Sequence, residues 1–180
     1  MSYHPDADHA QQFPQTPKKT DYDVVIIGGA TSGSTISFFL SANPDFKGSV
    51  LVVERDPSLS ESATRASNYC MRQQFATEIN INIAQYAAHF VKNFRKIVQD
   101  GAGLAPDLYI RNFGYLYLAD DEEFAQTLRD DQKVQAAEGA GTRIVSKEEI
   151  AKLYPFFDVS NVLLGSLNTQ DEGMSLSYCN

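Results

Sequence analysis

Tryptophan is absent from the 180-residue chain, cysteine occurs twice and histidine three times. The two cysteines, Cys70 and Cys179, are 109 positions apart, so we expect two reduced thiols rather than a disulfide framework. His4 and His9 lie near the N-terminus and His89 lies in a helical pattern. Neighbouring residues therefore build neither a His/Cys metal site nor a Cys–His pair, and we predict no metal.

Concentrated positive charge is also missing. The 15 Lys and Arg residues are outnumbered by 23 Asp and Glu residues, which gives a formal net charge of −8. This balance argues against a nucleic-acid surface and against a polybasic membrane patch. Apolar stretches are interrupted well before the roughly 18–20 residues of a membrane span. Residues 1–20 show neither a secretory signal pattern nor a transit-peptide pattern, so we expect a cytoplasmic protein.

The chain length suits one domain, or one domain and part of a second. Residues 1–20 are rich in Pro, Gln, Asp and Lys, and we predict a disordered arm there. The β-branched run 24–27 predicts a strand buried on both faces of a parallel sheet. A glycine-rich turn, a helix that ends at Asn43-Pro44 and a second strand at residues 50–53 follow.

The remaining residues predict a less regular series of elements. Residues 57–75 read as a loop, and an apolar stripe over residues 79–97 predicts a long helix with that stripe in the core. Residues 108–119 alternate around Asn112-Phe113-Gly114, which is typical of an antiparallel hairpin. Further expectations are a helix over residues 121–138, a short helix capped by Ser146 and ended by Pro155, and a strand at residues 162–164.

Residues 23–54 nearly reproduce a dinucleotide-binding fingerprint. In that motif a strand ends where the backbone passes close to a pyrophosphate, so glycines are needed, and the next helix directs its N–H groups at the phosphates. Glu54 lies 26 residues after Gly28, where a carboxylate accepts hydrogen bonds from an adenosine ribose and repels a 2′-phosphate. Ala30 replaces the middle glycine, which is tolerable if its φ is negative. A turn that serves only helix–strand packing is the alternative.

Four stretches resemble the D-amino-acid-oxidase-like superfamily of FAD-dependent oxidoreductases, which includes sarcosine and glycine oxidases. They are DVVIIGGATSGSTISFFL, VLVVERDPSLSESAT, MRQQFATEININIAQYAAHFVKNF, and GYLYLADDEEF through LNTQDEG. Their order and spacing are most similar to the branch of FAD-dependent oxidoreductase domain proteins. The resemblance implies an α/β fold with a Rossmann-like FAD-binding βαβ unit and the beginning of an interleaved α+β substrate domain.

The resemblance also implies FAD as the cofactor and roles for named residues. One group would cradle the pyrophosphate: Gly28, Gly29, Ala30, Ser32 and Gly33. Glu54 and Arg55 would hold the adenosine ribose and its surroundings, and Ser62, Thr64 and Ser67 match the segment along the ribityl chain and the flavin ring. Arg72 and Gln73 fall where this loop leaves the flavin, and they are the weak candidates for a catalytic role. Tyr69 stands where relatives keep small residues, and it would crowd the flavin.

More ordinary interpretations exist for several of these residues. Arg72 is also compatible with a structural ion pair, and Cys70 with a buried small side chain. The aromatic residues between 109 and 117 fit a strand face that packs on a core better than a substrate cage. Asp171 and Glu172 are adjacent on an extended segment and point to opposite faces, which argues against shared acid–base work.

The implied domain order is a disordered arm (1–20), an FAD-binding segment (21–105), a partial substrate-domain segment (106–168) and a truncated return to the FAD domain (169–180). The parent enzyme is expected to oxidise an amine or amino-acid C–N bond by hydride transfer to the flavin. By resemblance the chain would be about half of such an enzyme, so alone it is expected to be inactive and to expose apolar sheet faces. A mitochondrial location is also compatible with the family. The alternatives are a non-catalytic fragment or assembly factor, and an NAD-dependent reductase.

Overall fold

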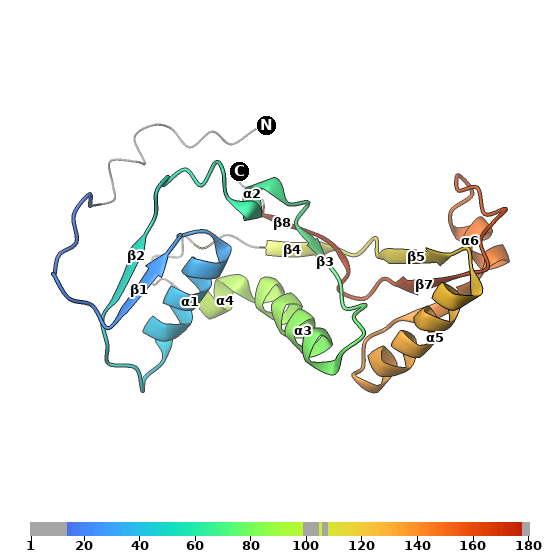
Figure 1. Ribbon diagram of the computed structural model, residues 1–180, viewed down its shortest axis with the longest axis horizontal. Coiled ribbons are helices and arrows are strands. Elements are labelled where there is room, and N and C mark those ends of the chain that lie inside the picture. The colour runs from blue at the N-terminus through green and yellow to red at the C-terminus, as the bar shows by residue number, and fades with distance from the viewer. Residues whose placement is uncertain (1–13, 99–104, 106–107, 178–180) are drawn as a thin grey trace. The chain divides into compact units, whose positions relative to one another are not determined.

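The computed structural model describes residues 14–98, 105 and 108–177, and Figure 1 shows their helices and strands. The chain divides into two compact units, residues 1–68 and residues 69–180, and each is described by itself. Parallel strands joined through a helix occur in the first unit and antiparallel sheets in the second. This mixture confirms the predicted α/β class. The finer domain boundaries expected from the sequence stay predictions.

The first unit is the predicted βαβ unit. Strands β1 (Val24–Ile27) and β2 (Val50–Val53) pair in parallel and in register over all four residues. Helix α1 (Thr31–Ala42) connects them, as the parallel pairing requires, and lies beside the pair in Figure 1. The backbone N–H of Asn43 donates to the last turn of α1, and Pro44 then prevents continuation.

The entry into the sheet is held by side chains. The carboxylate of Asp23 accepts hydrogen bonds from the backbone N–H and the hydroxyl of Ser49, at 2.7 and 2.8 Å. These bonds join the residue before β1 to the residue before β2, and they lower the pKa of Asp23. The register of the two strands is therefore fixed at the end opposite the glycine turn.

The expected burial of β1 on both faces is wrong for this unit. Ile26 is buried, but Val25 is 53% exposed and Ile27 is 90% exposed. The physical reason is that the described sheet has two strands, and α1 packs against one face only. The expectation of exposed apolar sheet surface is confirmed at these residues.

The described residues of the second unit form two three-stranded antiparallel sheets, with strand orders β3-β8-β4 and β5-β7-β6. The first sheet consists of β3 (Cys70–Met71), β4 (Leu108–Arg111) and β8 (Gly173–Ser177). The second consists of β5 (Tyr115–Ala119), β6 (Arg143–Ser146) and β7 (Leu164–Asn168). Its helices are α3 (Glu78–Lys92), α4 (Phe94–Val98), α5 (Glu122–Ala137) and α6 (Lys147–Leu153).

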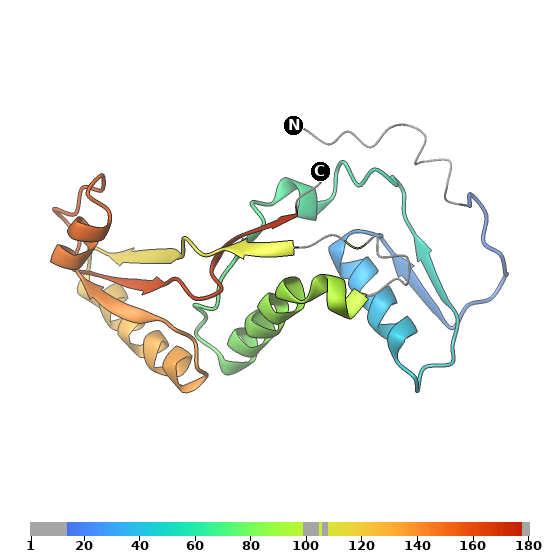
Figure 2. The same cartoon turned by 180° about the vertical axis from the view of Figure 1, so that it is seen from behind.

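Helices α5 and α6 cover opposite faces of the β5-β7-β6 sheet. Ala119 and Leu164 pack with α5 residues in one core cluster, whereas Val145 and Leu167 pack with Ile150 of α6 in another. Because successive strand residues point to opposite faces, these two clusters lie on the two sides of the sheet. Figure 2 shows this helix–sheet–helix region from behind. Both helices begin as capping physics predicts: Asp121 accepts from Phe124 N, and Ser146 accepts from Glu149 N.

Three sequence expectations fail in this unit. The 108–119 hairpin does not form, because β4 pairs with β8 and β5 pairs with β7 in different sheets. The long helix is interrupted at Asn93, between α3 and α4. The segment 57–75, read as a loop, contains the short helix α2 (Ala63–Ala66) and strand β3.

The stripe predicted for the helix core also lies on the wrong face. Ile79 and Ile83 are 65% and 59% exposed, whereas Ile81 and Ala88 are buried. The isoleucines of EININ repeat every second residue, so helical spacing alone does not decide which of them faces inward. Packing of α3 on β4 and α5 selects Ile81.

Candidate functional site

The glycine turn after β1 has the backbone geometry that the fingerprint requires. Gly28 has φ +98°, a conformation that favours glycine, and its N–H donates to Val53 O at 2.8 Å. A Cβ on Gly33 would lie 1.8 Å from Gly28 O, so α1 can approach the turn this closely only with glycine there. Ala30 has φ −68°, which meets the condition set for an alanine at this place.

The N-terminus of α1 is open to an anion. Ala30 is the N-cap residue, no side chain caps the helix, and its first turn holds no acidic residue. The first helical N–H groups, at Thr31, Ser32 and Gly33, have no intrahelical partner and form the positive end of the helix dipole. The Ser34 hydroxyl donates to Gly29 O, which ties the turn to the helix. A diphosphate fits this cradle of backbone amides.

Glu54 is joined directly to the glycine turn. Its Oε2 accepts the Gly29 N–H at 2.6 Å, and its Oε1 accepts the Asp56 N–H at 2.9 Å. Hydrogen bonds from the Asp56 and Gly29 amides lower the pKa of Glu54, so the side chain is charged at neutral pH. A carboxylate oxygen accepts more than one hydrogen bond, which leaves Glu54 able to bind ribose hydroxyls.

The remaining predicted residues of the first unit have definite partners. Arg55 forms a 2.8 Å ion pair with Glu61, with both side chains exposed. Ser62 caps α2 by accepting the Arg65 N–H, and Ser67 donates to Thr64 O. Thr64 Oγ1 lies 2.9 Å from Oγ1 of Thr31, the first residue of α1. The structure therefore brings Thr64 to the glycine turn and helix start, and engages Ser62 in capping.

Sequence reasoning missed Asp56 in this region. Hydroxyls of Ser60 and Ser58 donate to its carboxylate and hold its pKa far below the ordinary value. The D-x-S-x-S spacing is the signal that predicts such a turn. Through its N–H bond to Glu54 Oε1, this turn fixes the orientation of Glu54.

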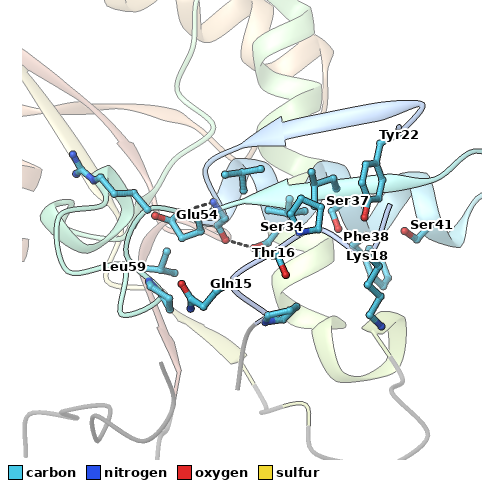
Figure 3. A pocket seen from close by; sticks show the side chains of 18 residues that line it. Gln15, Thr16, Lys18, Tyr22, Ser34, Ser37, Phe38, Ser41, Glu54 and Leu59 are labelled. Atoms are coloured by element: carbon cyan, nitrogen blue, oxygen red, sulfur yellow. Dashed lines mark hydrogen bonds between the residues drawn. The ribbon is translucent and has the colours of Figure 1, made fainter. Parts of the chain in front are cut away.

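A cavity of about 860 Å³ lies beside the glycine turn (Figure 3). Its lining includes Gly29 and Ser34 of the turn and α1, the strand residues 51–53, Glu54 and Arg55. Residues 14–18 form another part of its wall. Residues 14–18 are exposed and line this cavity, residues 1–13 lie outside the described part of the chain, and the disordered arm over residues 1–20 stays a prediction.

Arg72 and Gln73 belong to the second unit. The Arg72 guanidinium lies over the Phe75 and Tyr117 rings, 5.1 and 6.0 Å from their centroids, and its side chain is exposed. Gln73 is 3% exposed, and its Nε2 donates to Gln170 O at 2.9 Å. Gln73 therefore has the contacts of a structural residue, whereas the exposed Arg72 guanidinium keeps its hydrogen-bond donors at the surface.

Glu172 is a buried carboxyl that sequence reasoning did not single out for a role of its own. It is fully buried, and its Oε1 accepts the Gln73 N–H at 2.6 Å. Burial raises its pKa to about 7 despite that hydrogen bond and the nearby Arg72 charge. Its neighbour Asp171 pairs instead with Lys92 at 3.0 Å. The two adjacent acids thus have separate partners, as expected for side chains that point to opposite faces.

Cys70 and Tyr115 interact at the start of the second unit. Their hydrogen bond, together with burial, raises the pKa of Tyr115 to about 12. Cys70 is exposed, which corrects the interpretation of a buried small side chain, and it is not in a disulfide. Tyr69 has φ +52° and is 46% exposed. Cys179 lies outside the described residues.

The described residues hold neither a metal-binding cluster nor a membrane-spanning helix. Within them no cluster of three or more His, Cys, Asp or Glu side chains is placed to hold a metal ion. Across the same residues no helix has the length and apolar character needed to cross a bilayer.

Comparisons with known proteins agree with this geometry. The profile of the DAO family, described as FAD dependent oxidoreductase, matches residues 23–176. FAD-dependent oxidoreductase domain-containing protein 1 of Bos taurus is 32% identical over 159 residues, which cover 87% of this chain and 32% of that protein. The Xenopus laevis protein of the same name is 32% identical over 153 residues, covering 84% and 30%. The chain thus spans about a third of the length of these curated relatives.

Solved structures give the same result. L-proline dehydrogenase from P. horikoshii superposes with a TM-score of 0.68 at 26% identity, covering 87% of this chain and 38% of that one. Glycine oxidase from Geobacillus kaustophilus has a TM-score of 0.64 at 20% identity, covering 86% and 40%, and supports the fold. L-alpha-glycerophosphate oxidase from Mycoplasma pneumoniae, solved with FAD bound, has a TM-score of 0.57 at 21% identity, covering 86% and 38%. The glycine turn fits the family's cofactor, and the chain belongs to the DAO family of FAD-dependent oxidoreductases.

Proposed function

We infer that the first unit binds the adenosine diphosphate half of FAD. The observation that carries this inference is the 2.6 Å bond from Gly29 N to Glu54 Oε2, which places a charged carboxylate directly beside an uncapped helix N-terminus. The helix end suits the diphosphate and the carboxylate suits the ribose. Family membership selects FAD over the NAD alternative.

The predicted cofactor residues divide by what they offer. Gly28 permits the positive φ of the turn, Gly29 leaves its backbone bare for the diphosphate, and Gly33 lets α1 pack against the turn. Ala30 and Ser32 are proposed to offer backbone groups at the start of α1. Glu54 accepts hydroxyl hydrogens of the ribose. Ser62, Thr64 and Ser67 remain proposed for the ribityl side, with Thr64 supported by its contact with Thr31. Arg55 is paired with Glu61, so we propose that it contributes positive charge at the edge of the site rather than a direct hydrogen bond.

We further propose that the enzyme oxidises an amine or amino-acid C–N bond. When bound, FAD supplies the redox chemistry by accepting two electrons from the substrate. Support comes from family membership and from the 26% identity to a protein named for L-proline. The glycerophosphate oxidase shares the fold, so the fold alone does not determine the substrate. Arg72, with its exposed guanidinium, is the residue of this chain that we propose for a substrate carboxylate.

Binding of FAD to the purified chain tests the cofactor site. Flavin fluorescence quenching should give saturable binding, and Glu54→Gln should weaken it by about tenfold or more, because charge-assisted bonds to the ribose are lost. Asp45→Asn is the matched control, since it removes an exposed carboxylate of the same unit that does not line the cavity. Equal FAD affinity in the two variants would count against the site.

A substrate panel tests the reaction class. In the catalytically active oxidoreductase, an amino acid added without oxygen should bleach flavin absorbance at about 450 nm. Glycerol 3-phosphate serves as the comparison, because it offers a C–O bond and no nitrogen. If glycerol 3-phosphate bleaches the flavin and amino acids do not, the proposed reaction is C–O oxidation instead of C–N oxidation. The cofactor proposal would stand in that case.

A further inference from the structure

The chain before the βαβ unit has a defined place in the structure. Pro14, Thr16, Pro17 and Lys18 line the same cavity as Gly29 and Glu54. In Figure 3 the labelled Thr16 lies near Ser34 and Glu54, and Lys18 lies toward Phe38 and Ser41. The segment thus extends along the cavity from the glycine turn toward the far end of α1.

Local physics favours this path. Pro14 and Pro17 each fix their own φ, which reduces the conformations open to the segment, and the chain bends at residues 15, 16 and 18. The Lys19 N–H donates to Tyr22 Oη at 3.2 Å, which returns the chain toward β1. Asp23 then anchors the strand entry through Ser49. A segment restricted by two prolines and tied at one end loses less conformational freedom on forming a wall than an unrestricted one.

The cavity has the form of a nucleotide site. Its volume of about 860 Å³ is within the range of small-molecule and cofactor pockets. Glu54 lies in the lining together with Gly29, the residue of the glycine turn whose N–H donates to Glu54 Oε2. Along α1, Ser34, Ser37 and Ser41 recur at helical spacing and bring hydroxyls to the lining beside Phe38. A ligand with phosphates, a hydroxylated sugar and a flat base matches this sequence of surfaces.

We propose that residues 14–18 form a wall of the nucleotide site and contribute to the affinity for adenosine diphosphate, whether free or as part of FAD. The identity of the physiological ligand as FAD rests on the function proposed above. The wall itself rests on the lining of the cavity and on the anchoring of the segment. The consequence is that nucleotide affinity depends on residues that lie before the βαβ fingerprint.

Two truncations test the wall. Removal of residues 1–13 leaves the lining segment in place, and removal of residues 1–18 deletes it. Compared with the protein that lacks residues 1–13, the protein that lacks residues 1–18 should bind both FAD and ADP at least about fivefold more weakly. Flavin fluorescence measures FAD binding and calorimetry measures ADP binding. FMN has no adenosine half, so the two truncated proteins should bind it with equal affinity. Equal affinities for ADP in the two truncations would overturn the proposal.

Protection from trypsin gives a second measurement on the complete chain, so it does not depend on how the truncated proteins fold. Saturating ADP should slow cleavage after Lys18, whereas cleavage after Lys47 serves as the internal control because Lys47 is exposed and does not line the cavity. FMN should give no protection. Cleavage after Lys18 at the same rate with and without bound ADP would also overturn the proposal.

The outcomes separate this inference from the proposed function. If FAD binds but residues 14–18 have no effect, the wall is wrong and the cofactor site stands. If ADP binding depends on residues 14–18 and FAD does not bind, the wall stands and the assignment of FAD fails. If neither ligand binds the complete chain, both proposals fail.

Discussion

Glu172 and Gln73 are 99 positions apart, and the backbone N–H of Gln73 donates to the buried Glu172 carboxyl at 2.6 Å. Neighbouring side chains hold the same segment: Gln74 Nε2 donates to Ser166 O, and Gln135 Nε2 donates to Phe75 O, each at 3.1 Å. Residues 73–75 lie outside any strand: side chains bind the Gln73 N–H and Phe75 O, and the Phe75 N–H donates to Gln73 O at 2.8 Å. This network fixes the backbone directly after Arg72.

Stability should fall as pH rises through the range in which Glu172 ionises. Its folded-state pKa of about 7 is above the ordinary 4.5, so the folded protein retains a proton that the unfolded chain releases. The stabilisation is complete below about pH 4.5 and is lost by about pH 7, with an upper limit of roughly 3 kcal/mol. Urea unfolding at pH 5 and pH 8 measures this loss.

Glu172→Gln should remove most of that pH dependence, because an amide keeps an acceptor for the Gln73 N–H and does not ionise. Arg72 is the charged group that acts on Glu172, and Lys92 is engaged by Asp171. Glu122→Gln, on the exposed face of α5, is the control and should retain the wild-type slope. An unchanged slope in Glu172→Gln would show that other groups cause it.

Gln135→Met should destabilise the second unit by about 1–2 kcal/mol, because Phe75 O loses its donor while the side-chain volume is kept. Gln135 is 2% exposed, so water does not replace the lost bond easily. Gln126→Met on the same helix is the matched control, since Gln126 is exposed and bonds only to surface groups. Denaturant midpoints measure both changes. Equal midpoints for the two variants would contradict a tethering role of Gln135.

The βαβ unit was predictable from the sequence because its determinants are local. A β-branched run, glycines, a helical stretch closed by Asn43-Pro44 and Glu54 all lie within residues 23–54. The order of these elements and the place of Glu54 at the end of β2 follow directly from that spacing, whereas the bond from Gly29 to Glu54 was found only in the structure. The Ser146 cap was also predictable because a capping signal lies within a few residues, and the structure confirms it. Asp121 caps α5 by the same rule.

The second unit was less predictable because its pairings are distant. Gly114, with φ +87°, suits a turn, yet β4 and β5 take their partners from residues 164–177. The buried face of α3 likewise depends on its packing against β4 and α5. The isoleucines of EININ occur at every second residue, and this spacing does not reveal which of them is buried. Glu172 illustrates the same limit at the level of a site, since its burial and its bond to Gln73 join segments 99 positions apart.

Gly33→Ala should disrupt the first unit. The added Cβ would lie 1.8 Å from Gly28 O and 3.1 Å from Ile26 Cγ2, so α1 must move away from the turn. We expect a loss of about 3 kcal/mol in folding free energy and loss of FAD binding, measured by denaturation and fluorescence. Thr35→Ala, two residues later on the same helix and outside the cavity lining, controls for mutation of α1 itself. FAD binding at wild-type affinity by Gly33→Ala would show that the close approach is not required.

Arg72→Ala should weaken the use of amino acids by the catalytically active oxidoreductase. The exposed guanidinium over Phe75 and Tyr117 offers paired donors to a carboxylate, and their loss should raise KM by about tenfold or more. An amine substrate without a carboxylate should be unaffected, and FAD content should stay constant. Arg72→Lys should recover only part of the effect, because a lysine lacks the planar pair of donors. Arg129→Ala, an exposed arginine paired with Glu122, is the control. An equal rise in KM for the amine and the amino acid would mean that Arg72 does not bind the carboxylate.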